Sequence, residues 1–284
     1  MSLQHEFIPL TVATVEPETA AAVCITFTVP EALREAFAFR PGQHINVRAE
    51  LGGTEVRRSY SICSGPGERG IRIAVKQVDG GLFSKWACGN LRPGTVIDVM
   101  PPQGRFALAP PDGSPRHILG LAAGAGITPI ISMAAHALAL EPATRFTLVY
   151  GNRTVQDIMF REVLEDLKDR HLDRFTLVHV LSRERSEDGA LFEGRITADV
   201  LSRLADRLIP IREISHAYLC GPGSMIKELR NALFALGMPR DRVHHEFFAP
   251  GGGAYRTGTA AAEPASPVTR PEIATRAPTI EAIL

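Results

Sequence analysis

The sequence contains few cysteines, and none of them is spaced for a metal cluster or a disulfide framework. Four are scattered over 284 residues, with no C-x-x-C pair. They are Cys24, Cys63, Cys88 and Cys220. Closed zinc sites and small disulfide scaffolds need clustered cysteines, so this pattern argues against both and favours a reducing compartment. We therefore predict no metal site in the chain and expect a cytoplasmic protein.

The sequence also lacks an excess of charge of one sign and any long apolar run. Lys plus Arg and Asp plus Glu number 31 each, so no global field attracts the chain to nucleic acid or to an anionic membrane. The longest apolar stretches, 118–125 and 127–135, are too short and too interrupted by glycine to span a bilayer. No basic segment followed by an apolar core opens the chain, so we expect no secretory signal. We predict neither nucleic-acid nor membrane partners.

The chain is long enough for two domains, and its first part consists of short strands. We expect strands at 7–15, 22–29, 44–49, 58–63, 71–78 and 96–100. Gly- and Pro-containing turns separate them, and one helical stretch extends to residue 91. Closely spaced strands of this kind are typical of a small antiparallel β-barrel, which we assign to residues 1–111.

From residue 112 the pattern changes to strands that alternate with helices. We expect strands at 117–121, 146–150, 175–181, 217–220 and 243–248, and helices at 128–140, 155–168, 197–208 and 224–236. This alternation predicts an α/β domain with a parallel sheet over residues 112–248. Residues 249–284, rich in Ala, Pro, Thr and Gly, are predicted to be a flexible linker or tail in which only 279–284 resembles a strand.

Residues 57–64 combine cations, an aromatic ring and hydroxyls in one predicted strand. Alternation places Arg58 and Tyr60 on one face and Ser59 and Ser61 on the other. A guanidinium binds a pyrophosphate well, a Tyr ring offers a flat surface to a planar heterocycle, and a Ser hydroxyl can bond a ring nitrogen. The binding of a flavin dinucleotide requires these groups. Taken alone, the string fits an ordinary half-buried strand better.

Two glycine-containing turns directly precede predicted helices. In Gly80-Gly81-x-x-Ser84, the backbone and the hydroxyl can approach a phosphate, although a glycine turn with a Ser N-cap explains the same string. The turn 123–129 follows an apolar strand and has the context of a dinucleotide-binding turn. Its Gly124, Gly126 and Thr128 would lie near the phosphates, and a proline, Pro129, suits the first helical turn.

Two further strand ends in the second domain carry residues suited to a nicotinamide nucleotide. Ser182 and Arg183 can hold the 2′-phosphate of NADP, but the neighbouring Glu184 gives a mixed signal because acidic residues hold the 2′-hydroxyl of NAD. Cys220 and Gly221 precede the last helix, where a lowered thiol pKa and a catalytic contact would occur. A buried structural cysteine is the alternative.

In this order the motifs resemble the ferredoxin–NADP reductase superfamily over about residues 7–248. Within it, residues 75–84, 99–106 and 150–154 resemble the reductases of phenylacetyl-CoA epoxygenase (ring 1,2-monooxygenase) systems. The resemblance implies an antiparallel FAD-binding barrel followed by an α/β NAD(P)-binding domain. It also implies cofactor contacts from Arg58, Ser59, Tyr60, Ser61, Lys76, Gly81, Phe83, Ser84, Gly124, Gly126, Thr128, Pro129, Arg153, Ser182, Arg183, Cys220, Gly221 and Phe248.

The resemblance further implies catalysis by positioning and electrostatics, through Ser61, Cys220 and Glu246. We predict an FAD-dependent NADPH oxidoreductase, with NADH left open, that passes electrons to a ferredoxin-like iron–sulfur domain or protein serving a downstream oxygenase, as in phenylacetate degradation. No cysteine follows Cys220, so a 2Fe–2S cluster would be on a missing domain or a separate partner.

Three alternatives remain from the sequence. One is a reductase of the same superfamily that reduces free flavin, ferric iron or a heme partner. Another is a non-catalytic, flavin-binding redox subunit of a larger complex. The third is an NAD(P)-binding module without flavin. The order of the motifs over both domains disfavours the second and the third alternative.

Overall fold

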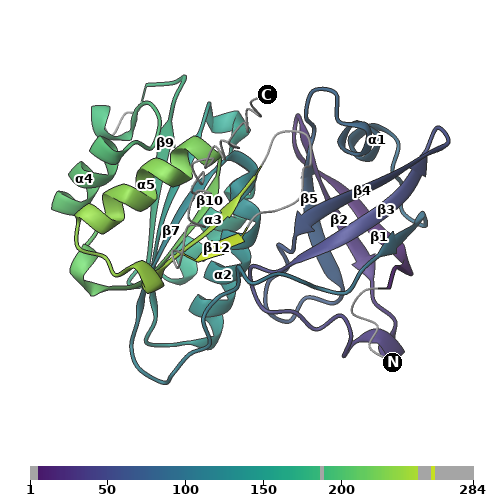
Figure 1. Ribbon diagram of the computed structural model, residues 1–284, viewed down its shortest axis with the longest axis horizontal. Coiled ribbons are helices and arrows are strands. Elements are labelled where there is room, and N and C mark those ends of the chain that lie inside the picture. The colour runs from purple at the N-terminus through teal and green to yellow at the C-terminus, as the bar shows by residue number, and fades with distance from the viewer. Residues whose placement is uncertain (1–5, 186–188, 249–256, 260–284) are drawn as a thin grey trace, which may run out of the picture.

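The computed structural model describes residues 6–185, 189–248 and 257–259 and arranges them as two β-sheets side by side (Figure 1). The first sheet has the strand order β4-β3-β6-β1-β2-β5, and the second has the order β12-β11-β10-β7-β8-β9. Each sheet is built from one part of the sequence, so the change of pattern near residue 112 corresponds to a change of architecture.

All strand pairs of the first sheet are antiparallel. Its strands are β1 (Ile8–Thr19), β2 (Ala22–Thr28), β3 (His44–Leu51), β4 (Thr54–Ser61), β5 (Ile71–Lys76) and β6 (Val96–Val99), with helix α1 (Leu82–Gly89). A bridge between Ile62 and Ile73 joins the end of β4 to β5 and closes the sheet on itself. Alternate residues such as Leu10, Ile25 and Val47 fill the interior, as a barrel requires.

The second sheet is parallel except for its edge strand β12. Its strands are β7 (His117–Ala123), β8 (Arg145–Asn152), β9 (Phe175–Leu181), β10 (Ile214–Gly221), β11 (Val243–Phe247) and β12 (Thr257–Thr259). Its helices are α2 (Ile127–Leu140), α3 (Arg161–Arg170), α4 (Ala198–Arg207) and α5 (Gly223–Ala235). Buried residues of α2 and α3 pack on one face, and those of α4 and α5 on the other. Both faces are therefore covered, which explains the continuous apolar strands.

Short 3₁₀ helices occupy several connections, and one of them corrects the sequence-based prediction. They are η2 (Glu31–Leu33), η3 (Gly124–Gly126), η4 (Val155–Asp157), η5 (Ala190–Phe192), η6 (Ile211–Glu213) and η7 (Arg240–Arg242). The predicted single helix 155–168 is wrong, because Ile158 is extended and Phe160 is left-handed at φ 60°, so α3 begins only at Arg161.

Strand β12 lies in a stretch for which the sequence predicts a linker. Its three residues pair antiparallel with β11, from His244 opposite Thr259 to Glu246 opposite Thr257. Pairing along a sheet edge uses main-chain groups and needs no apolar side chains, so composition alone did not reveal it. The strand expected at 279–284 lies outside the described residues.

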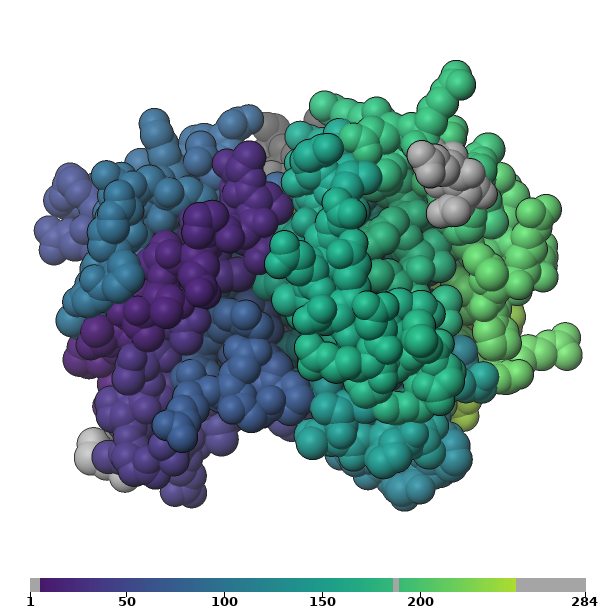
Figure 2. Space-filling model, turned by 180° about the vertical axis from the view of Figure 1, so that it is seen from behind, coloured from purple at the N-terminus to yellow at the C-terminus, as the bar shows by residue number. Residues whose placement is uncertain are grey.

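The two halves share one apolar cluster. Ala22, Cys24, Cys63 and Ala74 of the first half pack with buried residues of α2 and α3. The hydroxyl of Ser132 on α2 donates a hydrogen bond to the carbonyl oxygen of Ser64 at 2.9 Å. The Glu18 carboxylate accepts the Phe160 N–H, and the N-terminal strand lies directly against the teal part of the second half (Figure 2).

Among the described residues, no helix combines the length and the apolar character that crossing a bilayer requires. In the same part of the chain, no group of three His, Cys, Asp or Glu side chains is arranged to hold a metal ion.

A buried ion pair ties the connection between the halves to the end of α2. Arg116 is 8% exposed, bonds both Glu141 carboxylate oxygens at 2.6 and 2.7 Å, and donates to the carbonyl oxygen of Ala109 at 2.8 Å. We expect Arg116→Met to lower the free energy of unfolding by about 3 kcal/mol, because it leaves the Glu141 carboxylate, which is only 13% exposed, without its cation. Urea denaturation measures this change.

The control is Arg145→Met, which breaks an ion pair with Glu213 whose side chains are 49% and 56% exposed. Water screens that pair, so we expect a loss below about 1 kcal/mol. Equal losses in the two variants would show that burial does not decide the strength of the Arg116–Glu141 pair.

Candidate functional site

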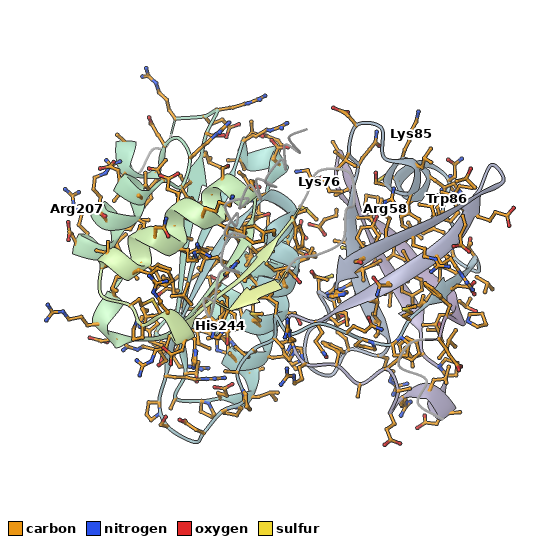
Figure 3. All side chains as sticks on the ribbon, in the orientation of Figure 1. Arg58, Lys76, Lys85, Trp86, Arg207 and His244 are labelled. Carbon is orange, nitrogen blue, oxygen red and sulfur yellow. The ribbon has the colours of Figure 1, made fainter. Side chains whose placement is uncertain are left out.

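Strand β4 presents the predicted flavin-binding residues on the barrel. Arg58 and Tyr60 are half-buried on one face of β4. Figure 3 shows Lys76 at the edge of the barrel that faces the second sheet. The Arg58 guanidinium donates to the carbonyl oxygen of Arg57 at 2.7 Å and has no acidic partner among the described residues. Its positive charge therefore remains available to a phosphate.

The Tyr60 ring is held from behind by an aromatic contact. It lies 5.6 Å from the ring of Phe83, which is fully buried and also lies 5.6 Å from the Trp86 ring. Burial raises the pKa of the Tyr60 hydroxyl, so the phenol stays neutral. Because Phe83 is enclosed between two rings, its side chain supports Tyr60 and does not itself reach outward.

Ser59 and Ser61 lie on the other face of β4 and differ in their partners. The Ser59 hydroxyl donates to the Asn46 amide oxygen. Ser61 is 2% exposed, and its Oγ has no hydrogen-bond partner among the described residues. An unsatisfied buried hydroxyl costs free energy unless a ligand pairs with it. The residues of β4 therefore fit a flavin, with the Ser61 hydroxyl left to bond it.

Helix α1 contributes backbone more than side chains to the predicted phosphate site. Ser84 is buried, and its hydroxyl donates to the Gly81 carbonyl oxygen and accepts the Val78 N–H, both at 3.3 Å. No side chain caps the N-terminus of α1, so the N–H groups of the first turn remain for an anion. The predicted contact at Gly81 and Ser84 would be made by the main chain.

The nucleotide-binding turn before α2 lies against the end of β10. A Cβ on Gly126 would lie 2.2 Å from the carbonyl oxygen of Cys220 and 2.9 Å from the backbone nitrogen of Gly221, which no residue but glycine permits. Gly124 has φ +53°, and its carbonyl oxygen accepts the Tyr150 hydroxyl at 2.9 Å. The structure thus brings the predicted residues of two separate turns into direct contact.

Thr128 and Pro129 shape the start of α2. Both are buried, and the Thr128 hydroxyl donates to the carbonyl oxygen of Ala125 at 3.0 Å. No side chain caps α2 at Gly126. The first-turn N–H groups are therefore the donors available to a dinucleotide phosphate, while the two side chains fix the turn.

Cys220 and Glu246 are adjacent residues of the parallel strands β10 and β11. Both are fully buried, and neither Glu246 carboxylate oxygen has a hydrogen-bond partner among the described residues. Burial raises the pKa of the Glu246 carboxyl to about 8. Burial, and then the nearby Glu246 charge, raise the pKa of the Cys220 thiol. The predicted lowering of the thiol pKa is wrong, because desolvation outweighs the helix that begins at Gly223.

The predicted nicotinamide residues therefore form a neutral, proton-holding pair. Phe248 follows β11 directly, and its N–H donates to the carbonyl oxygen of Gly221 at 3.1 Å. This bond places Phe248 beside the end of β10, the strand that carries Cys220. In its protonated form Glu246 can donate a hydrogen bond to a ligand, and Cys220 can contact it as an uncharged thiol.

The predicted 2′-phosphate residues lie at the ends of neighbouring strands. Ser182 and Arg183 follow β9, Arg153 follows β8, and all three are exposed. The Arg183 N–H donates to the carbonyl oxygen of Arg153 at 2.8 Å, so the two guanidiniums start from adjacent backbone. Neither has an acidic partner among the described residues, which suits binding of an anion.

Sequence reasoning missed two supporting residues, Asn46 and Glu18. Asn46 lies directly opposite Ser59 in the β3–β4 hairpin, whose turn is Gly52-Gly53. Counting outward from that two-residue turn would have predicted the pair. Glu18 contacts Phe160, 142 residues away, and no local signal in the sequence could have found that contact.

Comparison with known proteins matches both halves of the chain. Residues 10–108 match the model of the oxidoreductase FAD-binding domain, and residues 121–231 match that of the oxidoreductase NAD-binding domain. The chain is 46% identical over 244 residues to one of the subunits of 1,2-phenylacetyl-CoA epoxidase from Escherichia coli (strain K12), and the match covers 85% of this chain and 68% of that protein.

A second sequence relative and two solved structures are also similar to this chain. The ferredoxin reductase component of 3-ketosteroid-9-alpha-monooxygenase from Rhodococcus rhodochrous is 37% identical, over 84% of this chain and 64% of that protein. The structure of a ferredoxin NADP⁺ reductase from Neisseria gonorrhoeae with bound FAD and NADP covers 85% of this chain and 98% of its own at a TM-score of 0.71 and 18% identity. The structure of the ferredoxin reductase in carbazole 1,9a-dioxygenase covers 84% of this chain and 68% of its own, with a TM-score of 0.67 and 27% sequence identity. The chain spans about two thirds of the length of the two sequence relatives.

We expect Glu246→Gln to remove a pH dependence of stability. The carboxyl titrates near pH 8 when folded and near about 4.3 when unfolded, so the folded state retains a proton that the unfolded state has lost. Wild-type stability from this group is present at low pH and is lost as pH rises to about 8. The melting temperature of the variant minus that of the wild type should therefore increase as the pH is raised from about 5 to about 8.

The control is Glu165→Gln, because that carboxylate on α3 is 54% exposed. Its melting temperature relative to wild type should stay nearly constant over the same range. A constant difference for Glu246→Gln as well would contradict the burial of a protonated carboxyl.

Proposed function

We infer that this chain, which belongs to the ferredoxin–NADP reductase family of FAD- and NAD-binding oxidoreductases, is the NADPH-oxidising reductase component of an oxygenase system. The observation that carries this proposal is the 46% identity, over 85% of the chain, to a component of 1,2-phenylacetyl-CoA epoxidase. The contact of Gly126 with Cys220 supports it, because the nucleotide-binding turn and the neutral Cys220–Glu246 pair then belong to one site.

We assign FAD binding to residues 1–111 and nucleotide binding to residues 112–248. Arg58 and the first turn of α1 would hold the FAD pyrophosphate, Tyr60 would stack on the isoalloxazine, and Ser61 would bond it near N5. When bound, FAD supplies the conversion of a hydride into single electrons. The chain contributes orientation and the exclusion of water from the reacting atoms.

The second half would orient the nicotinamide nucleotide. The turn at Gly124 and Gly126 and the start of α2 would hold its phosphates. Cys220 and Phe248 would lie along the nicotinamide, and Glu246 would keep its proton there. Hydride transfer needs no acid or base from the protein, so these residues act through position and charge.

The electron acceptor we propose is a 2Fe–2S centre of ferredoxin type that serves an oxygenase acting on a coenzyme A thioester such as phenylacetyl-CoA. Similarity to the epoxidase component and to the steroid monooxygenase reductase supports this choice. The 284 residues do not contain the C-x₄-C-x₂-C spacing that such a cluster needs. The cluster would therefore be supplied from outside these residues.

An anaerobic titration of the purified protein with NADPH tests the reductase proposal. We expect a bound-flavin spectrum that bleaches rapidly with NADPH, and electron delivery to a plant-type ferredoxin exceeding delivery to free FMN. A spectrum that NADPH does not bleach would leave only a flavin-binding protein, and a colourless protein would remove the flavin assignment. Saturable turnover with free FMN alone would favour a flavin reductase.

A pair of neighbouring arginines provides the control for the flavin site. Arg58→Ala should lose FAD on gel filtration, whereas Arg57→Ala should retain it, because Arg57 lies on the other face of β4 and pairs with Glu55. Full retention of flavin by Arg58→Ala would contradict the pyrophosphate assignment.

The preference for NADPH should depend on Arg183. We expect Arg183→Ala to raise the KM for NADPH by about ten-fold or more, because a charged hydrogen bond to the 2′-phosphate is lost. The KM for NADH should change little. Arg207→Ala, on the outer end of α4 (Figure 3), is the matched control and should alter neither value. Equal effects of Arg183→Ala on both nucleotides would contradict the assignment.

A further inference from the structure

Glu184 lies beside the two residues to which we assign the 2′-phosphate, and its charge is of the wrong sign for that role. At the end of this strand, an acidic side chain commonly accepts the ribose hydroxyls of NAD. The structure directs the carboxylate elsewhere. Oε2 of Glu184 accepts the backbone N–H of Val155 at 2.9 Å, and Val155 is the first residue of η4.

This hydrogen bond continues a series between two neighbouring segments. The last paired residues of β8 and β9 are Asn152 and Leu181. Beyond them, the Ser182 N–H donates to the carbonyl oxygen of Asn152 at 3.0 Å, and the Arg183 N–H donates to that of Arg153 at 2.8 Å. The Glu184–Val155 bond comes next, so the two segments stay joined after the regular sheet has ended.

The Glu184 carboxylate therefore binds a main-chain N–H group. Glu184 is half-buried, while Ser182 and Arg183 are exposed. Within the described residues, Glu184 forms no salt bridge with Arg183 or Arg153. The N–H of Val155 starts a 3₁₀ turn and has no partner inside that turn, so the carboxylate satisfies a group that otherwise would need water.

We propose that Glu184 is a positioning residue for selection of NADPH: through Val155 it holds the segment that carries Ser182 and Arg183 on the end of β8. This inference rests on the proposed function, in which these two residues bind the 2′-phosphate. A segment held in place before binding loses less conformational entropy when the phosphate arrives. Glu184 thus favours NADPH although its charge alone would oppose a phosphate.

Two substitutions at position 184 separate this role from a direct one. Glu184→Ala removes the acceptor, and Glu184→Gln keeps a carbonyl oxygen at the same distance from Val155 but removes the charge. We expect Glu184→Ala to raise the KM for NADPH about five-fold, with the KM for NADH within about two-fold and both kcat values unchanged. Glu184→Gln should restore a KM for NADPH near that of the wild type. Glu162→Ala, at an exposed position on α3, is the control and should change nothing.

A decrease in the KM for NADPH in Glu184→Ala would overturn the proposal. If Glu184 repels the 2′-phosphate, both variants should lower the KM for NADPH. If Glu184 instead binds the ribose of NAD, both variants should raise the KM for NADH. A rise in the KM for NADPH that Glu184→Gln does not correct would also overturn it, because the acceptor oxygen is present in that variant.

Amide hydrogen exchange in the nucleotide-free protein gives a readout that does not depend on the substrate. The Val155 amide should exchange faster in Glu184→Ala and at the wild-type rate in Glu184→Gln. Unchanged exchange in Glu184→Ala overturns the proposal. If Arg183→Ala affects both nucleotides equally, the 2′-phosphate assignment fails. If Arg183→Ala behaves as expected and Glu184→Ala does not, the assignment stands and the role of Glu184 fails.

Discussion

The site depends on one close approach of backbone to backbone. The carbonyl oxygen of Cys220 occupies the place where a side chain on Gly126 would begin. The turn before α2 and the end of β10 therefore meet without an intervening atom, and the neutral Cys220–Glu246 pair lies next to the start of a helix. Two strands of a parallel sheet always present their carboxyl ends at one edge, but only a glycine allows this separation.

Helix α2 connects this part of the second domain to the barrel. It starts at the nucleotide-binding turn, and its Ser132 hydroxyl bonds the carbonyl oxygen of Ser64, three residues after Ser61. The apolar cluster around Cys63 and Ala74 packs on the same helix. One rigid element thus connects the residues assigned to the nucleotide with those assigned to the flavin, and hydride transfer needs such fixed distances.

Burial sets the chemistry of the site more than charge does. Glu246 and Cys220 lie in an apolar environment that favours their protonated forms, and Tyr60 stays a neutral phenol for the same reason. The guanidiniums of Arg58 and Arg183, in contrast, lie on half-buried and exposed surface, where charge is tolerated. Charged groups thus occupy the positions that we assign to phosphates, and neutral groups occupy the positions that we assign to the reacting rings.

The sequence by itself determined the two architectures, because hydrophobic period and turn residues are local properties. Alternating strands with Gly and Pro turns predicted the antiparallel barrel, and strands alternating with helices predicted the parallel sheet, and both are confirmed. The order of motifs also predicted the family. Local pattern failed at Phe160, where a left-handed residue interrupts an otherwise helical string, and at β12, where main-chain pairing alone forms a strand.

Only the tertiary structure decided the contacts between distant segments and the protonation of the site. The sequence predicted an activated thiol at Cys220 beside a helix start. Burial raises the pKa of that thiol instead, and the charge of Glu246, 26 positions later in the sequence, raises it further. The orientation of the Glu184 carboxylate is likewise set by its hydrogen bond with the N–H of Val155, 29 residues earlier. Desolvation and hydrogen bonding depend on what surrounds a group in space, and sequence neighbours do not specify those surroundings.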